Sequence, residues 1–420
     1  MTHLVVFLSF IGLVCILYLI RPKWTYFGII PLAILGGVIG GLILYQNLIE
    51  GTTAYIMEML TIFCGAVFVY MLKSTGSLES LIFSWIQIGR KNRYLMLLGL
   101  ITIGLIPGMG TGSALFSFFV LNTVMLPIIR QCGVGKAQIK SLLLTTAVLG
   151  MMAPPVNIPL MILKPFSGGA NADVYPFLWL VVIPGVLFSA LYFMRHCRFD
   201  QEKIKHLPNR KTSAGDFSGI VFVGILLVLR GLFPFGEIED IGLPLIFMLG
   251  VCLQWMVSWD KKESFFSISQ QALTATKPLL LLLVGCSLVM QVTHYTAAHY
   301  VIVGLAKNLP FVYAMVLLIL AGIVFGSLWE GLAAIVVMPI YIAHYSKDIV
   351  SSLDVFSAVV ACIICIGMLL PIGWNRPVFE TGTFENKMAG LTIIPAFFLL
   401  VWMLLVYWKV GIWFNQFFLS

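Results

Sequence analysis

The chain has 420 residues, of which 25 are Lys or Arg and 17 are Asp or Glu, giving a formal charge of +8. Hydrophobic residues make up 60% of the chain and charged residues only 10%, whereas soluble domains carry about 25% charged residues. A soluble enzyme, a nucleic-acid-binding protein and a disordered scaffold are therefore excluded, and the long continuous apolar runs exclude a transmembrane β-barrel. The composition predicts an all-α polytopic membrane protein in a lipid bilayer.

The first apolar segments approach the ~20 residues that a helix needs to cross the hydrocarbon core, and basic loops mark their cytoplasmic ends. Arg21 and Lys23 place the end of the first span in the cytoplasm, and the cluster Arg90–Arg93 marks that side again. The elements predicted before this cluster are spans at about 4–20, 24–45 and 54–72 and an interfacial amphipathic helix at 77–87.

The next apolar run, about 94–130, is basic at both ends and is interrupted by the glycine-rich stretch from Pro107 to Ser113. Two ordinary spans would also place both ends in the cytoplasm, but each half has only about 13–17 residues, fewer than a span needs. We therefore expect a re-entrant helical hairpin whose turn lies near mid-membrane, where protein or a hydrated cavity must cover the non-helical backbone.

A span at about 139–163 follows and is broken at Ala153–Asn157, where two prolines remove amide donors. After a further span at about 175–194, the stretch 195–216 carries six Lys or Arg against three acids, so it is predicted to be a cytoplasmic linker. It separates a first half, 1–194, from a second half, 217–420.

The second half has a similar order of elements. Arg230 stands at the end of its short first span, an awkward place for a charge. The predicted elements are spans at about 217–229, 241–259 and 278–293, an amphipathic stretch at 295–309, a hairpin at about 311–345 broken at Gly326–Gly331, a span at about 355–377 broken after Leu370, and a last span at 391–407.

The two halves align as an internal repeat. Gly322 follows Gly104 by 322 − 104 = 218 residues, and Gly367 follows Gly150 by 367 − 150 = 217 residues. Five crossings per half is an odd number, so the second copy would be inverted relative to the first. Gly and Pro often kink packed membrane helices without further function, but four breaks at matched positions favour the inverted repeat of a secondary transporter.

Broken helices supply the groups that bind ions and anions. Backbone carbonyls freed at a break can coordinate Na⁺, and helix N-termini attract carboxylates. The hairpin tip from Gly110 to Ser113 adds two hydroxyls to exposed backbone, and Asn157 and Asn375 follow the two proline breaks. These residues are therefore candidate ligands for sodium or for a carboxylate.

Charges inside the membrane are costly and so are functional candidates. Glu330, at the second hairpin tip, would ligand a cation, bind a proton or form a structural salt bridge. Arg376, beside the second break, would hold an anionic substrate or snorkel to the cytoplasmic interface. Cys362 and Cys365 are read as buried packing, and no motif for ATP hydrolysis, transition-metal binding or other enzymatic chemistry is found.

Together these motifs resemble the large membrane subunit (DctM-like permease) of TRAP transporters, tripartite ATP-independent periplasmic transporters within the ion transporter superfamily. The resemblance covers roughly residues 55–405. It depends on Gly108-x-x-x-Gly112-Ser113, Pro127, Gly133 and Gly150-x-x-x-Pro154-Pro155 in the first half, and on Gly326-x-x-x-Glu330, Pro339, Gly367 and Pro371-Ile372-Gly373-Trp374-Asn375 in the second.

The resemblance implies an elevator-type transporter of the bacterial inner membrane, in which a transport domain moves against a fixed scaffold. It further implies sodium-coupled uptake of organic acids, with a small membrane subunit and a periplasmic substrate-binding protein as partners. The sodium ligands it implies are Gly110, Thr111, Gly112, Ser113, Pro154, Asn157, Gly326, Ser327, Glu330, Gly373 and Asn375. The residues assigned to the carboxylate substrate are Ser113, Asn157, Asn375 and Arg376.

The chain departs from the family pattern at several positions. Val156 and Asn157 follow the proline pair where the family usually has Ser, Thr111 replaces a common Ser, and Arg376 replaces an apolar residue. A stand-alone carboxylate or anion symporter of the same superfamily, driven by Na⁺ or H⁺, is therefore the alternative interpretation. A non-transporting membrane scaffold or channel is a third.

The predicted orientation can be tested by labelling. A single cysteine placed in the linker 195–216 of an otherwise cysteine-free chain should react with a membrane-impermeant maleimide only from the cytoplasmic side, because basic loops remain there. Labelling of this linker from outside intact cells would overturn the whole topology.

Overall fold

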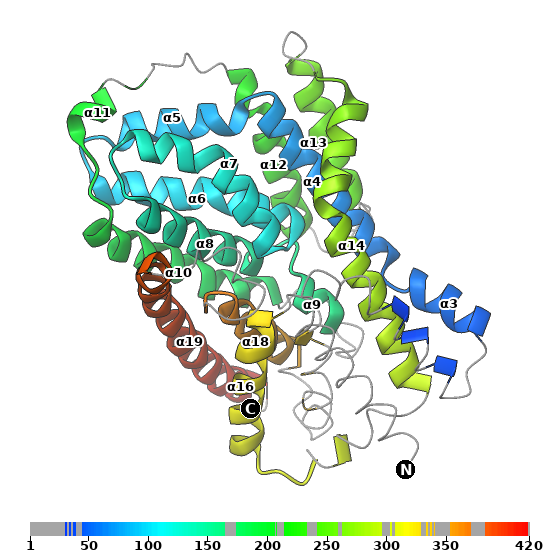
Figure 1. Ribbon diagram of the computed structural model, residues 1–420. Coiled ribbons are helices and arrows are strands. Elements are labelled where there is room, and N and C mark those ends of the chain that lie inside the picture. The colour runs from blue at the N-terminus through cyan, green and yellow to red at the C-terminus, as the bar shows by residue number, and fades with distance from the viewer. Residues whose placement is uncertain are drawn as a thin grey trace.

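The computed structural model (Figure 1) describes residues 30–31, 33–34, 37–38, 44–163, 174–205, 207, 214–232, 242–258, 263–295, 303–304, 307–328, 333–334, 337, 340, 353–370 and 383–418. Every regular element in these residues is a helix. Six of the described helices are long and apolar enough to cross a membrane, which makes the chain a multi-pass, all-α membrane protein. The predicted span at about 4–20 lies outside the described residues, as does the greater part of the span at about 24–45.

The helices follow the predicted order. The first half contains α3 (Leu44–Thr53), α4 (Ile56–Ser74), α5 (Ser77–Gly89), α6 (Arg93–Thr111), α7 (Ala114–Gln131), α8 (Lys136–Met152), α9 (Ile158–Leu163) and α10 (Val174–His196). The linker contains α11 (Gln201–Lys205) and the short 3₁₀ helix η4 (Ala214–Phe217). The second half contains α12 (Ser218–Leu232), α13 (Leu243–Val257), α14 (Phe265–Tyr295), α16 (Phe311–Leu328), α18 (Leu353–Gly367) and α19 (Thr383–Phe418).

Several predicted boundaries are wrong. Helix α3 occupies the residues between the predicted spans at 24–45 and 54–72. Helix α14 begins at Phe265, well before the predicted start at 278, and α19 extends beyond 391–407 at both ends. Pro278 lies inside α14, and membrane helices tolerate an internal proline. Polar residues at the ends of these two helices conceal their true length, because hydropathy marks only the part that is continuously apolar.

Helices from the two halves of the chain pack together in two groups. In the first group, α4 packs against α13 and α14, α12 against α13, and α3 against α14. In the second group, α8 packs against α6, α7, α10 and α19, while α18 packs against α16, α19 and α9. Helix α4 also contacts α6, which joins the two groups. Figure 1 shows α4 and α14 side by side, although far apart in sequence.

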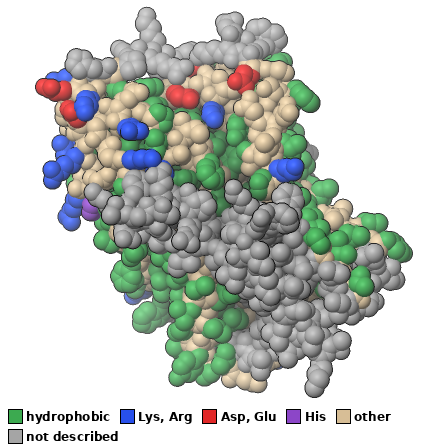
Figure 2. Space-filling model, in the orientation of Figure 1, with side chains coloured by type: hydrophobic (Ala, Val, Ile, Leu, Met, Phe, Trp, Pro, Cys, Tyr) green, Lys and Arg blue, Asp and Glu red, His purple; other side chains and the backbone are tan. Residues whose placement is uncertain are grey.

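The surface of α10 matches a lipid environment. Leu180, Ile183, Leu187 and Leu191 recur at helical spacing and are exposed, while Leu178, Val181, Val182 and Phe193 on the opposite side are buried. A helix that is apolar on all sides belongs inside a protein or a bilayer. Figure 2 shows hydrophobic side chains over the lower part of the visible face and most of the visible charges on its upper part.

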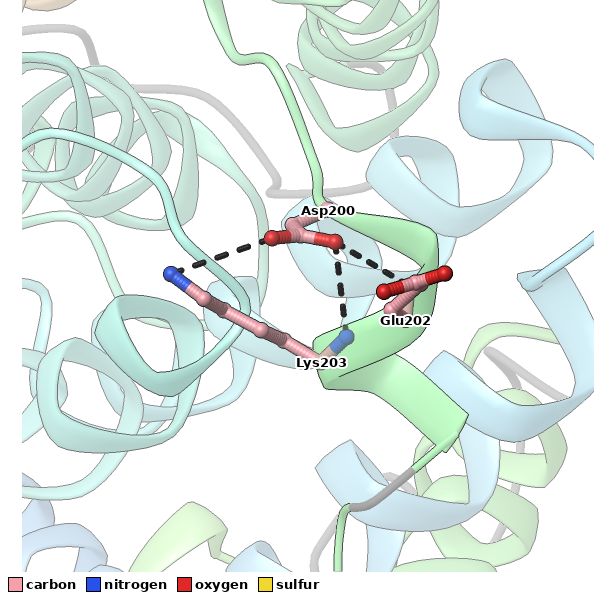
Figure 3. Close-up of polar contacts among 3 residues, drawn as sticks. All are labelled: Asp200, Glu202 and Lys203. Atoms are coloured by element: carbon pink, nitrogen blue, oxygen red, sulfur yellow. Dashed lines mark hydrogen bonds and ion pairs between the residues drawn. The ribbon is translucent and has the colours of Figure 1, made fainter.

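The charged linker is anchored to the turn between α7 and α8. The backbone N–H of Asp200 donates to the carbonyl of Cys132 at 2.9 Å. The Asp200 carboxylate caps α11, since its Oδ1 accepts from the backbone N–H of Glu202 at 3.0 Å, and its Oδ2 lies 3.8 Å from Nζ of Lys203 (Figure 3). Burial raises the pKa of the Cys132 thiol to about 11, so this thiol remains protonated at neutral pH.

Glycines allow α6 and α8 to approach at backbone distance. A Cβ added to Gly108 would lie 2.5 Å from the carbonyl carbon of Gly150, and one added to Gly150 would lie 2.8 Å from the carbonyl oxygen of Leu105. Such small-residue contacts replace the hydrophobic driving force that helices lack inside a bilayer.

The same contact recurs between α16 and α18. A Cβ on Gly326 would collide with the backbone of Ile364, and one on Gly367 would collide with the carbonyl oxygen of Ile323. Gly367 and Ile323 follow Gly150 and Leu105 of the first pair by 217 and 218 residues. The repeat predicted from glycine spacing is therefore accompanied by equivalent helix–helix contacts, while its inversion remains a prediction.

Substitution of Gly108 tests this contact. Gly108→Ala should lower the free energy of unfolding by about 1–3 kcal/mol, because overpacking forces the two backbones apart. Gly224→Ala on α12 is the matched control, since a Cβ at Gly224 meets nothing within 4 Å. Thermal unfolding in detergent measures both, and equal midpoints for the two variants would contradict a close α6–α8 contact.

Candidate functional site at the hairpin tip and the broken helices

The first hairpin turns over two residues. Gly112 has a φ of 63° and its N–H donates to the Gly108 carbonyl at 2.7 Å, while Ser113 is extended and its Oγ accepts from the N–H of Phe116 at 3.1 Å. Glycine ends α6 because it adopts a left-handed conformation without strain, and serine begins α7 as an N-cap.

The interruption is shorter than the sequence predicts. Pro107 lies inside α6, which continues to Thr111, so the prediction of a break from Pro107 onwards is wrong. The helices have 19 and 18 residues rather than about 13–17. Length alone therefore no longer separates a re-entrant hairpin from two spans, and re-entry remains a prediction.

The hairpin tip is a buried polar region. Thr111 and Ser113 are buried, and the Thr111 hydroxyl donates to the Pro107 carbonyl at 2.7 Å. A hydroxyl that donates its proton still presents two lone pairs. The oxygen of Thr111 is therefore of the kind that coordinates a hard cation such as Na⁺.

The first proline break is found where the sequence predicts it. Helix α8 ends at Met152 and α9 begins at Ile158. Pro154 is buried, and the Pro154–Pro155 peptide bond is cis. Asn157 is 2% exposed and caps α9, because its Oδ1 accepts from the N–H of Leu160 at 3.0 Å.

The hairpin tip, the first break and α18 come together. A Cβ on Gly112 would lie 3.1 Å from the backbone N of Ile158, which places the tip directly against the break. From the break, Asn157 Nδ2 reaches Sγ of Cys365 on α18 at 3.9 Å. Cys365 is fully buried. Segments far apart in sequence thus form one buried region with capped helix ends and hydroxyl and amide side chains.

Of the predicted second hairpin, the structure describes mainly the first helix, α16. Gly326 packs against α18, and the buried Ser327 hydroxyl donates to the carbonyl of Val324 at 2.6 Å. Glu330, Gly373, Asn375 and Arg376 lie outside the described residues. Within the described residues no cluster of three His, Cys, Asp or Glu side chains is placed to hold a metal ion.

A cavity beside the first break contains charged residues that the sequence analysis did not select. It has a volume of about 220 Å³ and is lined by Met57, Glu58, Thr61, Pro155, Asn157, Leu160, Met161, Tyr175, Arg230, Gly242, Leu243 and Pro244. Glu58 lies within an otherwise apolar span and Arg230 near the end of another. The cost of a charge inside a membrane was the signal in the sequence that could have identified them.

In comparisons with known proteins, the sequence matches no protein-family model and no curated protein. What is established is the class of protein, an all-α, multi-pass membrane protein, with a buried polar region at the hairpin tip and the first break.

The capping role of Asn157 predicts a graded effect of substitution. Asn157→Ala should lower the free energy of unfolding by about 1 kcal/mol, because α9 loses its cap. Asn157→Ser should cost less, since serine also caps helices. Thermal unfolding of both variants measures the difference, and equal losses would show that the amide contributes through contacts other than the cap.

Proposed function

We propose that this chain is the large membrane subunit of a TRAP-type secondary transporter in the bacterial inner membrane, which takes up organic acids together with Na⁺ by an elevator mechanism. The observation that carries the proposal is the meeting of the first hairpin tip with the broken α8–α9 span and α18. Transporters of this kind bind ions and substrate where discontinuous helices meet.

Sodium coupling is supported by the chemistry of the tip and the break. The non-helical stretch from Ala153 to Asn157 lies between two helices. The Asn157 carbonyl accepts from the N–H of Met161 in α9 at 2.9 Å, whereas the carbonyls from Ala153 to Val156 belong to neither helix. The buried oxygen of Thr111 lies in the adjoining tip. Carbonyl and hydroxyl oxygens suit a hard monovalent cation, and Glu330 of the second tip would add a charged ligand.

An elevator is supported by the two groups of helices. The group α3, α4, α12, α13 and α14 would be the scaffold, and the group containing both hairpins and broken spans would be the transport domain. Between them, Gly65 of α4 packs against the backbone of Gly110 at the tip. Small residues leave a smooth surface there, which suits two domains that move past each other.

The carboxylate substrate would bind through Ser113, Asn157, Asn375 and Arg376. The small membrane subunit and the periplasmic binding protein follow from the resemblance. Exposed apolar side chains such as Leu249 on α13 and Phe266 on α14 give the proposed scaffold a face on which either lipid or a membrane subunit would pack.

Thermal unfolding of the purified chain in Na⁺ and in choline, at equal ionic strength, tests the proposal. Na⁺ should raise the free energy of unfolding with the logarithm of its concentration, by about 2.7 kcal/mol at a concentration 100 times the dissociation constant. Thr111→Val should weaken this effect by removing one oxygen ligand.

Thr276→Val on α14 is the matched control, because Thr276 is equally buried and its hydroxyl makes the same bond to the carbonyl four residues earlier. A sodium effect of the same size in both variants would show that Thr111 at the hairpin tip does not bind sodium. If sodium has no effect, uptake should be measured for the chain alone with a proton gradient as the driving force. Uptake under these conditions would identify the stand-alone symporter instead.

A further inference from the structure

The cavity beside the first break brings two opposite charges to one small space. Glu58 comes from α4 and Arg230 from the end of α12, and both side chains line the cavity. No ion pair within 4.0 Å joins them in the described structure. Each charge can therefore be met by the opposite charge of a ligand in the cavity.

Arg230 has unused donor capacity. Its Nη1 atom is buried and has no hydrogen-bond partner in the described structure. A buried guanidinium N–H without a partner is costly, and a carboxylate would satisfy it with two parallel hydrogen bonds. The first residues of α13, from Gly242 to Pro244, line the same cavity, and a helix N-terminus also favours negative charge.

The carboxylate of Glu58 requires a positively charged partner or a hydrogen-bond donor. No hydrogen bond or ion pair of its carboxylate is found among the described residues. A carboxylate at a half-buried position inside an apolar span is expensive unless a cation or a donor satisfies it. An ammonium group supplies both the positive charge and the N–H donors.

The remaining walls define the size and character of the ligand. Leu160, Met161 and Leu243 are apolar, whereas Thr61 and Tyr175 add neutral hydroxyls. Drug-sized ligands occupy pockets of about 300–1,000 Å³, so the volume of about 220 Å³ suits a smaller molecule. A short apolar chain with an anionic and a cationic end fits all of these features.

We propose that this cavity binds a small zwitterion, with its carboxylate on Arg230 and its ammonium on Glu58. The proposal goes beyond the proposed function, because Glu58 and Arg230 stand on α4 and α12 of the proposed scaffold. The carboxylate that is transported is assigned instead to residues at the hairpin tip and the breaks. Asn157 lines the cavity and also caps α9 at the break, so the ligand would contact the helix end proposed to bind sodium.

Binding to the purified full-length chain in phosphatidylglycerol nanodiscs tests this proposal, with thermal unfolding as the readout. The probes are ω-amino acids of increasing length, namely glycine, β-alanine, 4-aminobutyrate and 5-aminopentanoate. Butyrate and butylamine are matched controls that each carry one of the two charges. One length should raise the unfolding temperature progressively with its concentration. Each control should bind about tenfold more weakly or worse, because it leaves one charge unpaired.

Two variants, each of which removes one charge, test which side chain binds which end of the ligand. Arg230→Gln should abolish binding of the zwitterion and of butyrate, whereas Glu58→Gln should make the zwitterion bind no better than butyrate. Arg198→Gln and Glu202→Gln are matched controls on the exposed linker and should bind normally. Arg230→Lys provides a second test if Arg230→Gln does not fold, because it keeps the charge but loses the paired hydrogen bonds and should weaken binding about tenfold.

The outcomes separate this proposal from the proposed function. If sodium stabilises the chain but no amino acid does, the cavity is not a zwitterion site, while transport stands. If butyrate binds as well as any amino acid and Glu58→Gln changes nothing, the zwitterion is wrong. If stabilisation appears only in nanodiscs that contain phosphatidylethanolamine, the ligand is a lipid headgroup rather than a solute. If an amino acid binds but sodium has no effect, the site stands and sodium coupling fails.

Discussion

The contact between α6 and α8 is the constraint on which the rest of the candidate site depends. Inside a bilayer, non-helical backbone is tolerated only where protein or water covers it. Gly108 and Gly150 let the two helices approach at backbone distance, and this approach brings the hairpin tip against the break at Ala153–Asn157. Each interruption is then covered by the other. A side chain at either glycine would separate the helices and expose both.

A buried glutamine joins three helices in the core of the molecule. Gln254 on α13 is fully buried, accepts from the N–H of Gly219 at 3.0 Å and donates to Oγ of Ser77 at 3.1 Å. One side chain thus satisfies the beginnings of two helices, α12 and α5. Arg230 differs from Gln254, because its buried Nη1 has no hydrogen-bond partner in the described structure, and it lines a cavity together with Glu58. Their cost is the reason to assign them a ligand.

Much of the architecture could be predicted from the sequence. Continuous apolar runs predicted α10, α12 and α13 because a bilayer leaves a helix few alternatives. The break after Met152 was predicted because two prolines remove consecutive amide donors. The same argument fails at Pro107, because a single proline deep in a packed membrane helix does not end the helix. Its neighbours in α7 and α8, which cover the helix, are invisible in the local sequence.

The sequence by itself determined the class of protein, the position of the first break and the glycines that bring helices together. These properties follow from the chemistry of short segments, namely hydropathy, missing amide donors and missing side chains. Only the tertiary structure decided that Asn157 reaches Cys365 and that Glu58 and Arg230 line one cavity. Each of these pairs joins helices separated by well over a hundred residues. Their meeting depends on how whole helices pack, which no local pattern specifies.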